Sequence, residues 1–340
     1  MKMYLCRPIV NNVKMYNVAV IAGGDSGEYE VSLKTADNIF NQLNRELFNP
    51  YLILFKGSDW SYTDKQGVKY QINKNDFTLS LPAETIRFDV AFIAIHGTPG
   101  ENGKLQSYFE MIKQPYTGCN SFTSALTFNK YFCNVAADAL GIPISASLHF
   151  YRNDEIDVER IEKVCGYPCF VKSCNSGSSV GVTKVHGRDE LAKACEEAFK
   201  YDSQLMVEKF VRGREFTCGV TSVYGDVRVL AVTEVVATNE FYDYDAKYSA
   251  VGHKLITPAE LPQEAEEAIR RYSTRLFHHL ECKGVVRFDF ILSENDGIPY
   301  FLEVNTIPGQ TAMSIVPGQV VYNKLDIKDF YTKMVLEALK

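Results

Sequence analysis

Two stretches of alternating apolar and polar residues near the C-terminus place two carboxylates where they could bind a metal ion. Arg287 and Asp289 lie two residues apart in the first stretch, so they share one face of a predicted strand. Glu303 and Asn305 share one face of the second stretch for the same reason. The Asp-Gly pair at 296–297 between them is a strong signal for a β-hairpin. A turn centred on residue 296 sets Asp289 opposite Glu303. The same register sets Arg287 opposite Asn305.

Two carboxylates that face each other across a hairpin need a positive charge between them. Like charges repel there by about 4 kcal/mol at a separation of about 4 Å and a protein-like dielectric constant. Asp, Glu and Asn supply only oxygen ligands, which suit Mg2+ better than zinc, and such Mg2+ usually shares its coordination shell with substrate phosphates. The alternative is a surface ladder of charges balanced by Arg287, but the bulky apolar residues on the opposite face make it the poorer interpretation. The hairpin therefore predicts a Mg2+ site and leaves the ligand unnamed.

A loop of small residues at 173–181 follows Lys172 and is rich in backbone N–H groups that could cradle a phosphate. Lys172 would meet the phosphate charge. The loop lacks the Gly-Lys-Ser/Thr ending of a Walker loop, and a tight β-hairpin explains the loop alone equally well. Further along, Glu208 and Glu215 flank a turn, where they could bind an exocyclic amine of adenine and the hydroxyls of a ribose. A solvated pair of surface charges is the alternative there.

A stretch at about 237–255 shows no clear periodicity and is rich in tyrosine. Loops of this length are uncommon and often act as lids, so its tyrosines could close over a site while Lys247 reaches a phosphoryl group. An exposed tyrosine-rich strand is the alternative, which the Asp and Asn content disfavours.

The elements that must position these residues divide into three parts. Residues 15–118 predict an α/β unit with a parallel sheet and a ligand crevice at its strand ends, built on strands near 17–22, 51–55 and 89–95. Residues 119–210 predict a smaller α+β domain, with a single helix at 121–140, strands at 169–172 and 205–210 and a helix at 189–201. Residues 211–340 predict strands at 215–223 and 227–235, a helix from Pro262 and the hairpin.

Composition and charge restrict the class of partner. The 340 residues are 46% hydrophobic and 23% charged, which suits two or three folded domains rather than a disordered chain. A net charge of −6 without a long Lys/Arg run predicts small-molecule partners rather than nucleic acid or a membrane. Nine cysteines without a CxxC pair, and the lack of a long apolar run, predict reduced thiols in a cytoplasmic protein. Residues 1–14 are expected to be an extension, with Met15 an alternative start.

In order and spacing, the motifs resemble the D-alanine–D-alanine ligase family of the ATP-grasp superfamily. The resemblance runs from about residue 15 to the end and is carried by Gly23-Gly24-x-Ser26-x-Glu28, His96-Gly97, Lys130, Val171-Lys172, Gly177-Ser178-Ser179-Val180-Gly181, Glu208-Lys209, Phe241-Tyr242-Asp243-Tyr244-x-Ala246-Lys247-Tyr248, Arg287-x-Asp289 and Glu303-x-Asn305-Thr306-x-Pro308-Gly309. It implies a three-domain ATP-grasp fold with a Rossmann-like N-terminal domain, and a dimer. It also implies that ATP phosphorylates a first D-alanine and that a second attacks the acyl phosphate, giving D-alanyl-D-alanine for peptidoglycan.

The resemblance also implies roles for individual residues. Two Mg2+ ions, for which Mn2+ could substitute, would bind Asp289, Glu303 and Asn305. ATP would be held by Lys130, Lys172, Ser179, Glu208, Lys209, Val211, Glu215 and Tyr242. Catalysis would fall to Glu28, Ser178, Lys247, Tyr248, Arg287 and Gly309, with Arg287 stabilising the oxyanion. The amino-acid substrates would meet Glu28, His96, Glu101, Ser314 and Ile315.

Several alternatives stay open at this point. Asp25 and Glu28 also fit a capping box before a helix, and His96 could be an ordinary loop histidine. The second substrate could be D-lactate or D-serine, although the resemblance associates Tyr248 with amino acids rather than lactate. A regulatory protein that binds ATP without catalysis is a further alternative, against which the complete set of charged motif residues argues. Ser173 and Gln310 depart from the family pattern and put the rigidity of their loops in question.

Overall fold

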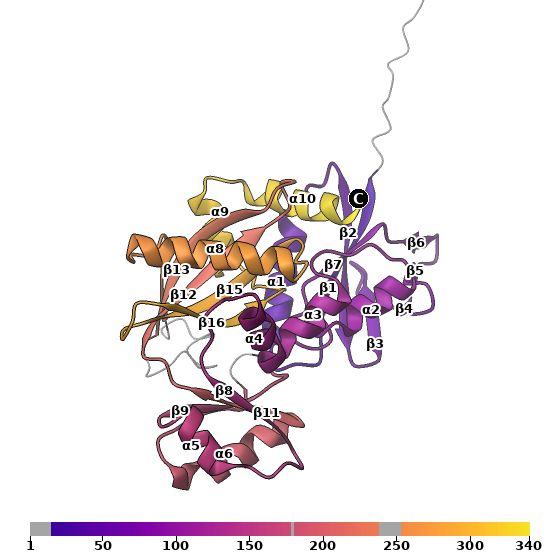
Figure 1. The fold of residues 1–340 in the computed structure, drawn as a ribbon. Helices are drawn as coiled ribbons and strands as arrows, with labels where there is room; N and C mark the ends of the chain where they lie inside the picture. Colours follow the sequence, from indigo (N-terminus) through magenta and orange to yellow (C-terminus); the bar gives the residue numbers. More distant parts are fainter. Residues whose placement is uncertain (1–14, 178–179, 238–252) are drawn as a thin grey trace, which may run out of the picture.

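The computed structural model describes residues 15–177, 180–237 and 253–340. Their strands form three sheets that follow one another along the chain (Figure 1). No helix in these ranges is both long and apolar enough to cross a membrane. The predicted domain boundaries at 118/119 and 210/211 remain predictions.

The N-terminal sheet has seven strands in the order β6-β5-β4-β3-β2-β1-β7. Strand β1 (Tyr16–Gly23) pairs in parallel with β2 (Phe48–Lys56) and with β7 (Val90–Ile93), so the predicted parallel strands are present. The sheet continues through four antiparallel strands that were not predicted, β3 (Asp59–Thr63), β4 (Lys69–Asn73), β5 (Thr78–Ser80) and β6 (Thr85–Arg87). They were missed because they are short and partly exposed, which leaves little apolar alternation.

Helix α1 (Tyr29–Gln42) packs on this sheet through Ala36 and Ile39, and α2 (Lys104–Met111) packs on it through Leu105 and Phe109. The single helix predicted at 121–140 is instead two, α3 (Ser121–Phe128) and α4 (Lys130–Ala139). Asn129 separates them because its backbone is extended (φ −84°, ψ 107°) and its side chain accepts a hydrogen bond from Phe132 N. This N-cap makes Lys130 the first residue of α4.

The second sheet has four antiparallel strands in the order β10-β9-β11-β8 and carries two helices. Its strands are β8 (Ser147–Tyr151), β9 (Cys169–Ser173), β10 (Val182–Val185) and β11 (Gln204–Lys209). The helices are α5 (Val158–Val164) and α6 (Arg188–Tyr201), which lie on the far side from the rest of the molecule (Figure 1). Their apolar residues form a separate core that leaves the other face of the sheet available for a ligand.

The third sheet is antiparallel in the order β14-β13-β12-β15-β16, and its strands are β12 (Gly213–Thr221), β13 (Arg228–Ala237), β14 (His253–Ile256), β15 (Val285–Ser293) and β16 (Pro299–Asn305). Helix α8 (Gln263–His279) packs against one face through Ile269 and Phe277, which share a core with Phe288 and Phe290. Because side chains alternate along a strand, the opposite face of β15 carries Arg287 and Asp289.

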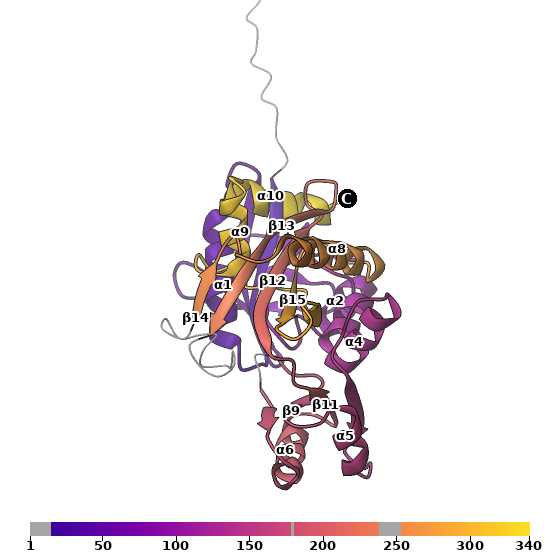
Figure 2. The ribbon, with the colours of Figure 1, turned by 60° about the vertical axis from the view of Figure 1, so that its left-hand side comes forward.

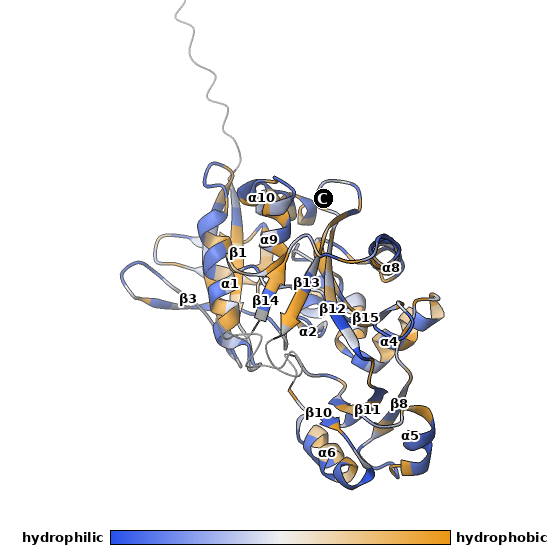
Figure 3. Ribbon diagram, turned by 90° about the vertical axis from the view of Figure 1, so that its left-hand side faces the viewer, coloured by the Kyte–Doolittle hydropathy of each residue, from blue (hydrophilic) through white to orange (hydrophobic). Residues whose placement is uncertain are grey.

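Of the C-terminal helices, α9 (Ile315–Tyr322) packs on β13 of the third sheet, and α10 (Ile327–Ala338) returns to the N-terminal sheet (Figures 1 and 2). Tyr331 and Val335 of α10 share a buried core with Val18 and Phe92 of that sheet. The hydropathy colouring shows apolar strands such as β1 and β13 inside and polar surfaces on the helices around them (Figure 3). The first and third sheets are thus joined by a continuous apolar core.

Candidate active site

The carboxylate hairpin has the register predicted from the sequence. Asp289 pairs with Glu303, and Arg287 pairs with Asn305. The register shifts directly after Asp289, so that Phe290 pairs with Phe301 and residue 302 is extra. Such bulges re-aim side chains and are common beside active sites.

Asp289 is held by three neighbours. Arg287 donates from Nε and from its terminal nitrogen to the two Asp289 oxygens, each at 2.9 Å. Thr217 Oγ1 donates to Asp289 Oδ1 at 2.6 Å, and Asn305 Nδ2 donates to Oδ2 at 2.9 Å. Thr217 pairs with Asp289 from strand β12, so Thr217, Asp289 and Glu303 form one row across three strands.

Lys130 connects this row to the loop of small residues. Its Nζ lies 3.4 Å from Glu303 Oε2 and donates to Ser176 O at 2.7 Å. The Lys130 side chain is 14% exposed, so the pair is only partly screened by water. The first residue of α4 therefore joins the third sheet to the loop after β9.

Lys172 and Glu208 form an ion pair on the second sheet. Their side chains meet at 2.5 Å, and Glu208 is almost fully buried. Asn134 Nδ2 donates to the other Glu208 oxygen at 3.4 Å. A buried carboxylate of this kind is tolerated because it is paired and hydrogen-bonded.

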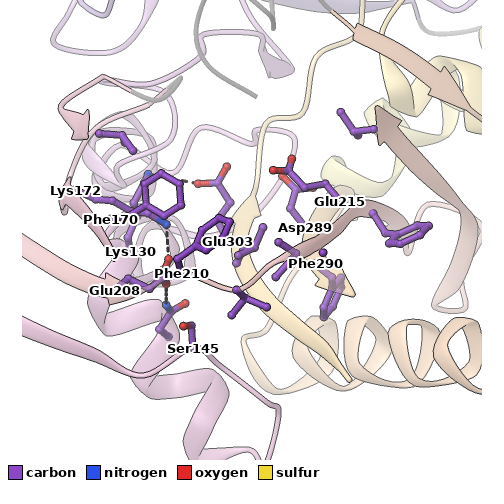
Figure 4. Close-up of a pocket in the computed structure, with 18 of the residues that line it drawn as sticks. Lys130, Ser145, Phe170, Lys172, Glu208, Phe210, Glu215, Asp289, Phe290 and Glu303 are labelled. Carbon is purple, nitrogen blue, oxygen red and sulfur yellow. Dashed lines mark hydrogen bonds and ion pairs between the residues drawn. The ribbon is translucent and has the colours of Figure 1, made fainter. Parts of the chain in front are cut away.

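A cavity of about 620 Å³ lies between the second and third sheets. Figure 4 shows Lys172 and Glu208 on one side, Glu215 and Asp289 on the other, and Glu303 between them beside Lys130. Apolar side chains complete its walls, among them Phe170, Val182, Met206, Phe210, Val211, Phe216, Val235, Phe290, Ile291, Leu302 and Ile315. The cavity can thus hold a flat apolar group at one end and an anion, with cations, at the other.

The donors in the carboxylate row suit a hard divalent cation. Among the residues that the structure describes, no three His, Cys, Asp or Glu side chains converge on one point. Asp289 and Glu303 nevertheless face each other, and Asn305 adds an amide beside them. Two carboxylates and an amide leave positions that phosphate oxygens would fill, which is the usual arrangement for Mg2+. The residues present therefore fit Mg2+ bound together with a nucleotide.

Glu28 approaches the site from the N-terminal sheet. It is the residue before α1, and its side chain makes no capping hydrogen bond to that helix, so the capping-box interpretation is wrong. Asp25 instead accepts a hydrogen bond from Gly57 N. An ideal Cβ on Gly177 would lie 2.6 Å from Glu28 Oε2, and one on Gly97 would lie 3.4 Å away. The Glu28 carboxylate thus lies against the loop of small residues, where only glycine leaves room for it.

His96 is buried rather than exposed in a loop, with 5% of its surface accessible. Its Nδ1 lies 2.9 Å from Ile307 O and its Nε2 lies 2.9 Å from Thr35 Oγ1. Burial lowers the pKa of His96, although Glu28 opposes the shift. The ring is therefore neutral, with Nδ1–H donating to the carbonyl and Nε2 accepting from the hydroxyl. This arrangement gives His96 a role in holding the segment after β16.

Glu101 holds the same segment. It accepts from Gly97 N at 2.7 Å and from Ile307 N at 3.2 Å. Burial, and next the charge of Glu28, raise the pKa of Glu101 to about 8. The loop after β7 is therefore bonded to the residues that follow the carboxylate hairpin.

Gly309, Ser314 and Ile315 lie at the entry to α9. Ser314 is the residue before that helix, its Oγ lies 2.8 Å from Thr311 Oγ1, and Ile315 lines the cavity. An ideal Cβ on Gly309 would lie 2.9 Å from Ser314 Oγ. The N-terminus of α9 therefore presents backbone N–H groups on the side where an anion could bind.

Most of the residues predicted to bind the nucleotide lie around this cavity. The cavity is lined by the predicted nucleotide residues Lys130, Lys172, Glu208, Lys209, Val211 and Glu215. Five predicted residues, Ser178, Ser179, Tyr242, Lys247 and Tyr248, lie outside the described part of the chain, as does most of the predicted lid.

Sequence reasoning named Val211 and Ile315 but missed the other apolar walls and one polar partner of the site. Phe170 lies two residues from Lys172 and Met206 two residues from Glu208, so they share faces with the predicted residues. Thr217 likewise shares a face with Glu215 on β12. The two-residue alternation of strands, applied outward from each charged residue, would have found Phe170 and Met206. It would also have placed Thr217 on the face of Glu215, but not its contact with Asp289.

Comparisons with known proteins agree with this geometry. Residues 17–119 match the family described as D-ala D-ala ligase N-terminus, and residues 137–336 match D-ala D-ala ligase C-terminus. The chain is 43% identical over 324 residues to a D-alanine–D-alanine ligase of Parabacteroides distasonis, covering 95% of this chain and 98% of that protein.

Solved structures of ligases with the same fold superpose on this chain over nearly its whole length. The D-alanyl-alanine synthetase A of Vibrio cholerae superposes with a TM-score of 0.87 at 33% identity, over 96% of this chain and 98% of its own. The VanG D-Ala:D-Ser ligase of Enterococcus faecalis gives 0.85 at 31% identity, over 96% and 100%. The D-alanine–D-alanine ligase of Bacillus anthracis complexed with ATP gives 0.77 at 27% identity, over 96% and 97%.

Proposed function

The chain belongs to the D-alanine–D-alanine ligase family, and we propose from this premise that it joins two D-alanine molecules at the expense of ATP. The product, D-alanyl-D-alanine, is a precursor of peptidoglycan. The observation that carries the proposal is the cavity in which Lys130 and Lys172 face the Asp289 and Glu303 carboxylates. A cavity lined by both cationic and carboxylate side chains suits a triphosphate that binds together with its cations.

ATP would bind between the second and third sheets. Phe170, Met206 and Leu302 supply apolar walls for the base, and Glu208 and Glu215 supply acceptors for its amine and for the ribose. Lys130 and Lys172 would contact the phosphates as point charges. The ATP complex of the Bacillus anthracis ligase supports the choice of nucleotide.

We further propose that two Mg2+ ions bind at Asp289, Glu303 and Asn305, with Mn2+ as a working substitute. When bound, they would offset the charge of the transferring phosphoryl group. Arg287 would then exchange part of its contact with Asp289 for the substrate. Its guanidinium has five N–H groups, of which Asp289 takes two.

The protein side chains carry out the remaining steps. Glu28 would bind the ammonium group of the first D-alanine, whose carboxylate takes the γ-phosphoryl group with release of ADP. The amine of the second D-alanine attacks the acyl carbon and gives up a proton as the amide bond forms, and Arg287 stabilises the oxyanion there until phosphate leaves. The α9 N-terminus and Ser314 would hold the carboxylate of the second D-alanine. The predicted lid, with Lys247 and Tyr248, would exclude water from the acyl phosphate.

Purified protein incubated with ATP, Mg2+ and D-alanine tests the function directly. We expect one phosphate per dipeptide, measured by phosphate release and by mass spectrometry of the product. Release of phosphate without any dipeptide would contradict it. A competition between D-alanine, D-serine and D-lactate then tests the second substrate, because a D-Ala:D-Ser ligase is among the structural neighbours. Preferential D-alanyl-D-serine formation would reassign the substrate.

We also propose a homodimer in the cytoplasm, where ATP is supplied. Exposed apolar side chains on α2, α3 and α4, namely Met111, Phe122 and Val135, offer surface for a second copy. Size-exclusion chromatography with light scattering would give twice the chain mass of 38.4 kDa, and a monomer at micromolar concentration would contradict the assembly.

A further inference from the structure

The segment between β16 and α9, residues 306–314, is anchored by buried contacts that lie outside the catalytic site. It begins directly after the metal-site strand and ends at the helix whose first residue, Ile315, lines the cavity. Gln310 lies in its middle and is only 3% exposed. A buried amide side chain must find partners inside the protein.

Gln310 finds these partners on α10 and α1. The Tyr331 hydroxyl, on a fully buried side chain of α10, lies 3.2 Å from Gln310 Oε1 and 3.3 Å from Gln310 O. Asn38 Nδ2 of α1 donates to Gln310 O at 2.6 Å and to the Tyr331 hydroxyl at 3.3 Å. Gln310 Nε2 donates back to Pro308 O at 3.2 Å, which folds the segment on itself.

A second set of bonds closes a circuit that starts and ends on the same segment. Gln310 N lies 3.5 Å from Thr35 Oγ1, a long contact that the hydroxyl can accept. The Thr35 hydroxyl then donates to His96 Nε2, and His96 Nδ1–H donates to Ile307 O. Every donor in this circuit has one acceptor. The hydrogen bonds therefore hold segment 306–314 in one position against the N-terminal domain.

These contacts hold the residues that would meet the second amino acid. Gly309 is adjacent to Gln310, and Ser314 is the residue that directly precedes α9. We propose that Gln310 and Tyr331 are positioning residues for the second amino-acid substrate, which they serve by fixing segment 306–314 against α1 and α10. The inference rests on the proposed ligase function and names what sets the geometry of its second substrate site.

The positioning role of Gln310 and Tyr331 can be tested by replacing the two residues singly and together. Gln310→Met removes the amide at similar volume, and Tyr331→Phe removes only the hydroxyl. Each single change leaves a buried polar partner less satisfied, whereas the double change leaves an apolar contact. Steady-state kinetics would vary D-alanine widely enough to resolve both of its Michaelis constants, with ATP varied separately.

We expect each single variant to raise the KM of the second D-alanine by about three- to tenfold while the KM of ATP stays unchanged. The double variant should show an increase smaller than the product of the two single effects, because the two changes share one contact. Tyr300→Phe is the matched control, since it removes a hydroxyl bonded to Asp296 at the hairpin tip.

The outcomes separate this inference from the proposed function. If the wild-type protein forms no dipeptide, the function fails first. If the wild type is active and the single variants lower only the thermal unfolding midpoint, the pair is structural and the positioning role is wrong. Equal changes in the KM of ATP and of both D-alanines would also overturn it.

Discussion

The Arg287 guanidinium and the Asp289 carboxylate form a bidentate ion pair, with one 2.9 Å hydrogen bond to each carboxylate oxygen. The same two oxygens would be needed by a metal ion, and the same guanidinium by the oxyanion. In this structure each group satisfies the other. The contact removes the cost of leaving either charge unpaired.

Replacing Arg287 with lysine should separate the two chemical steps. Arg287→Lys keeps a positive charge beside Asp289 but loses the planar fork that could contact the oxyanion. We expect dipeptide formation to fall by about 10²–10³-fold. D-alanyl phosphate should still form, and trapping with hydroxylamine would measure it.

Arg228→Lys is the matched control, because Arg228 contacts Asp226 in the same two-residue spacing on the exposed surface. Its activity should equal that of the wild type. Equal loss of the trapped intermediate and of the dipeptide in Arg287→Lys would show that Arg287 acts before the amine attack.

Replacing Asp289 with asparagine should change the metal requirement. Asp289→Asn keeps the shape of the side chain but removes the negative charge that a divalent cation needs. We expect the Mg2+ concentration for half-maximal activity to rise by about tenfold or more, together with a loss of kcat. A Mg2+ titration of activity measures this, with Asp226→Asn as the control. An unchanged Mg2+ midpoint would remove Asp289 from the metal site.

Replacing Gly177 with alanine should disturb Glu28 across the interface between the loop and the N-terminal sheet. The added methyl group would lie 2.6 Å from Glu28 Oε2, so the carboxylate must move. We expect the KM of the first D-alanine to rise by about tenfold, since a displacement of this size is costly in an active site.

Gly318→Ala serves as its control, because a methyl group on this exposed helix residue meets no atom within 4 Å. A Gly177→Ala enzyme with an unchanged KM for the first D-alanine would place Glu28 outside the substrate site.

Local patterns were enough to predict the carboxylate hairpin. Its turn residues and its alternation both lie within 285–305, so one register satisfies the apolar and the polar face together. The Lys172 and Glu208 strands were predicted for the same reason. Each such prediction depends only on residues close together in the chain.

The missed features depend on contacts between distant residues. Thr217 reaches Asp289 only because β12 pairs with β15, and His96 is buried because Ile307 lies beside it. No local pattern contains that information. The break at Asn129 was missed for a different reason, since both flanking helices have similar apolar spacing and the cap is a single residue.

The burial of neutral His96 predicts how stability depends on pH. Its pKa is lowered in the folded protein, so the unfolded chain takes up a proton first as the pH falls below about 6.5. The stabilisation is therefore complete above that value and is lost toward acid. Glu101 acts in the opposite direction, because its pKa of about 8 makes the folded state lose stability as the pH rises from about 4.5.

The difference between wild type and His96→Gln isolates the histidine, since both proteins contain Glu101, Glu28 and Arg287. Urea unfolding at several pH values should show the stability advantage of the wild type shrinking as the pH falls from 6.5 to 5.5. His279→Gln, on the exposed end of α8, is the control. An advantage that stays constant between these pH values would mean that His96 accepts a proton in the folded protein as readily as in the unfolded chain. Its circuit through Thr35 to Ile307 would then not require the neutral ring.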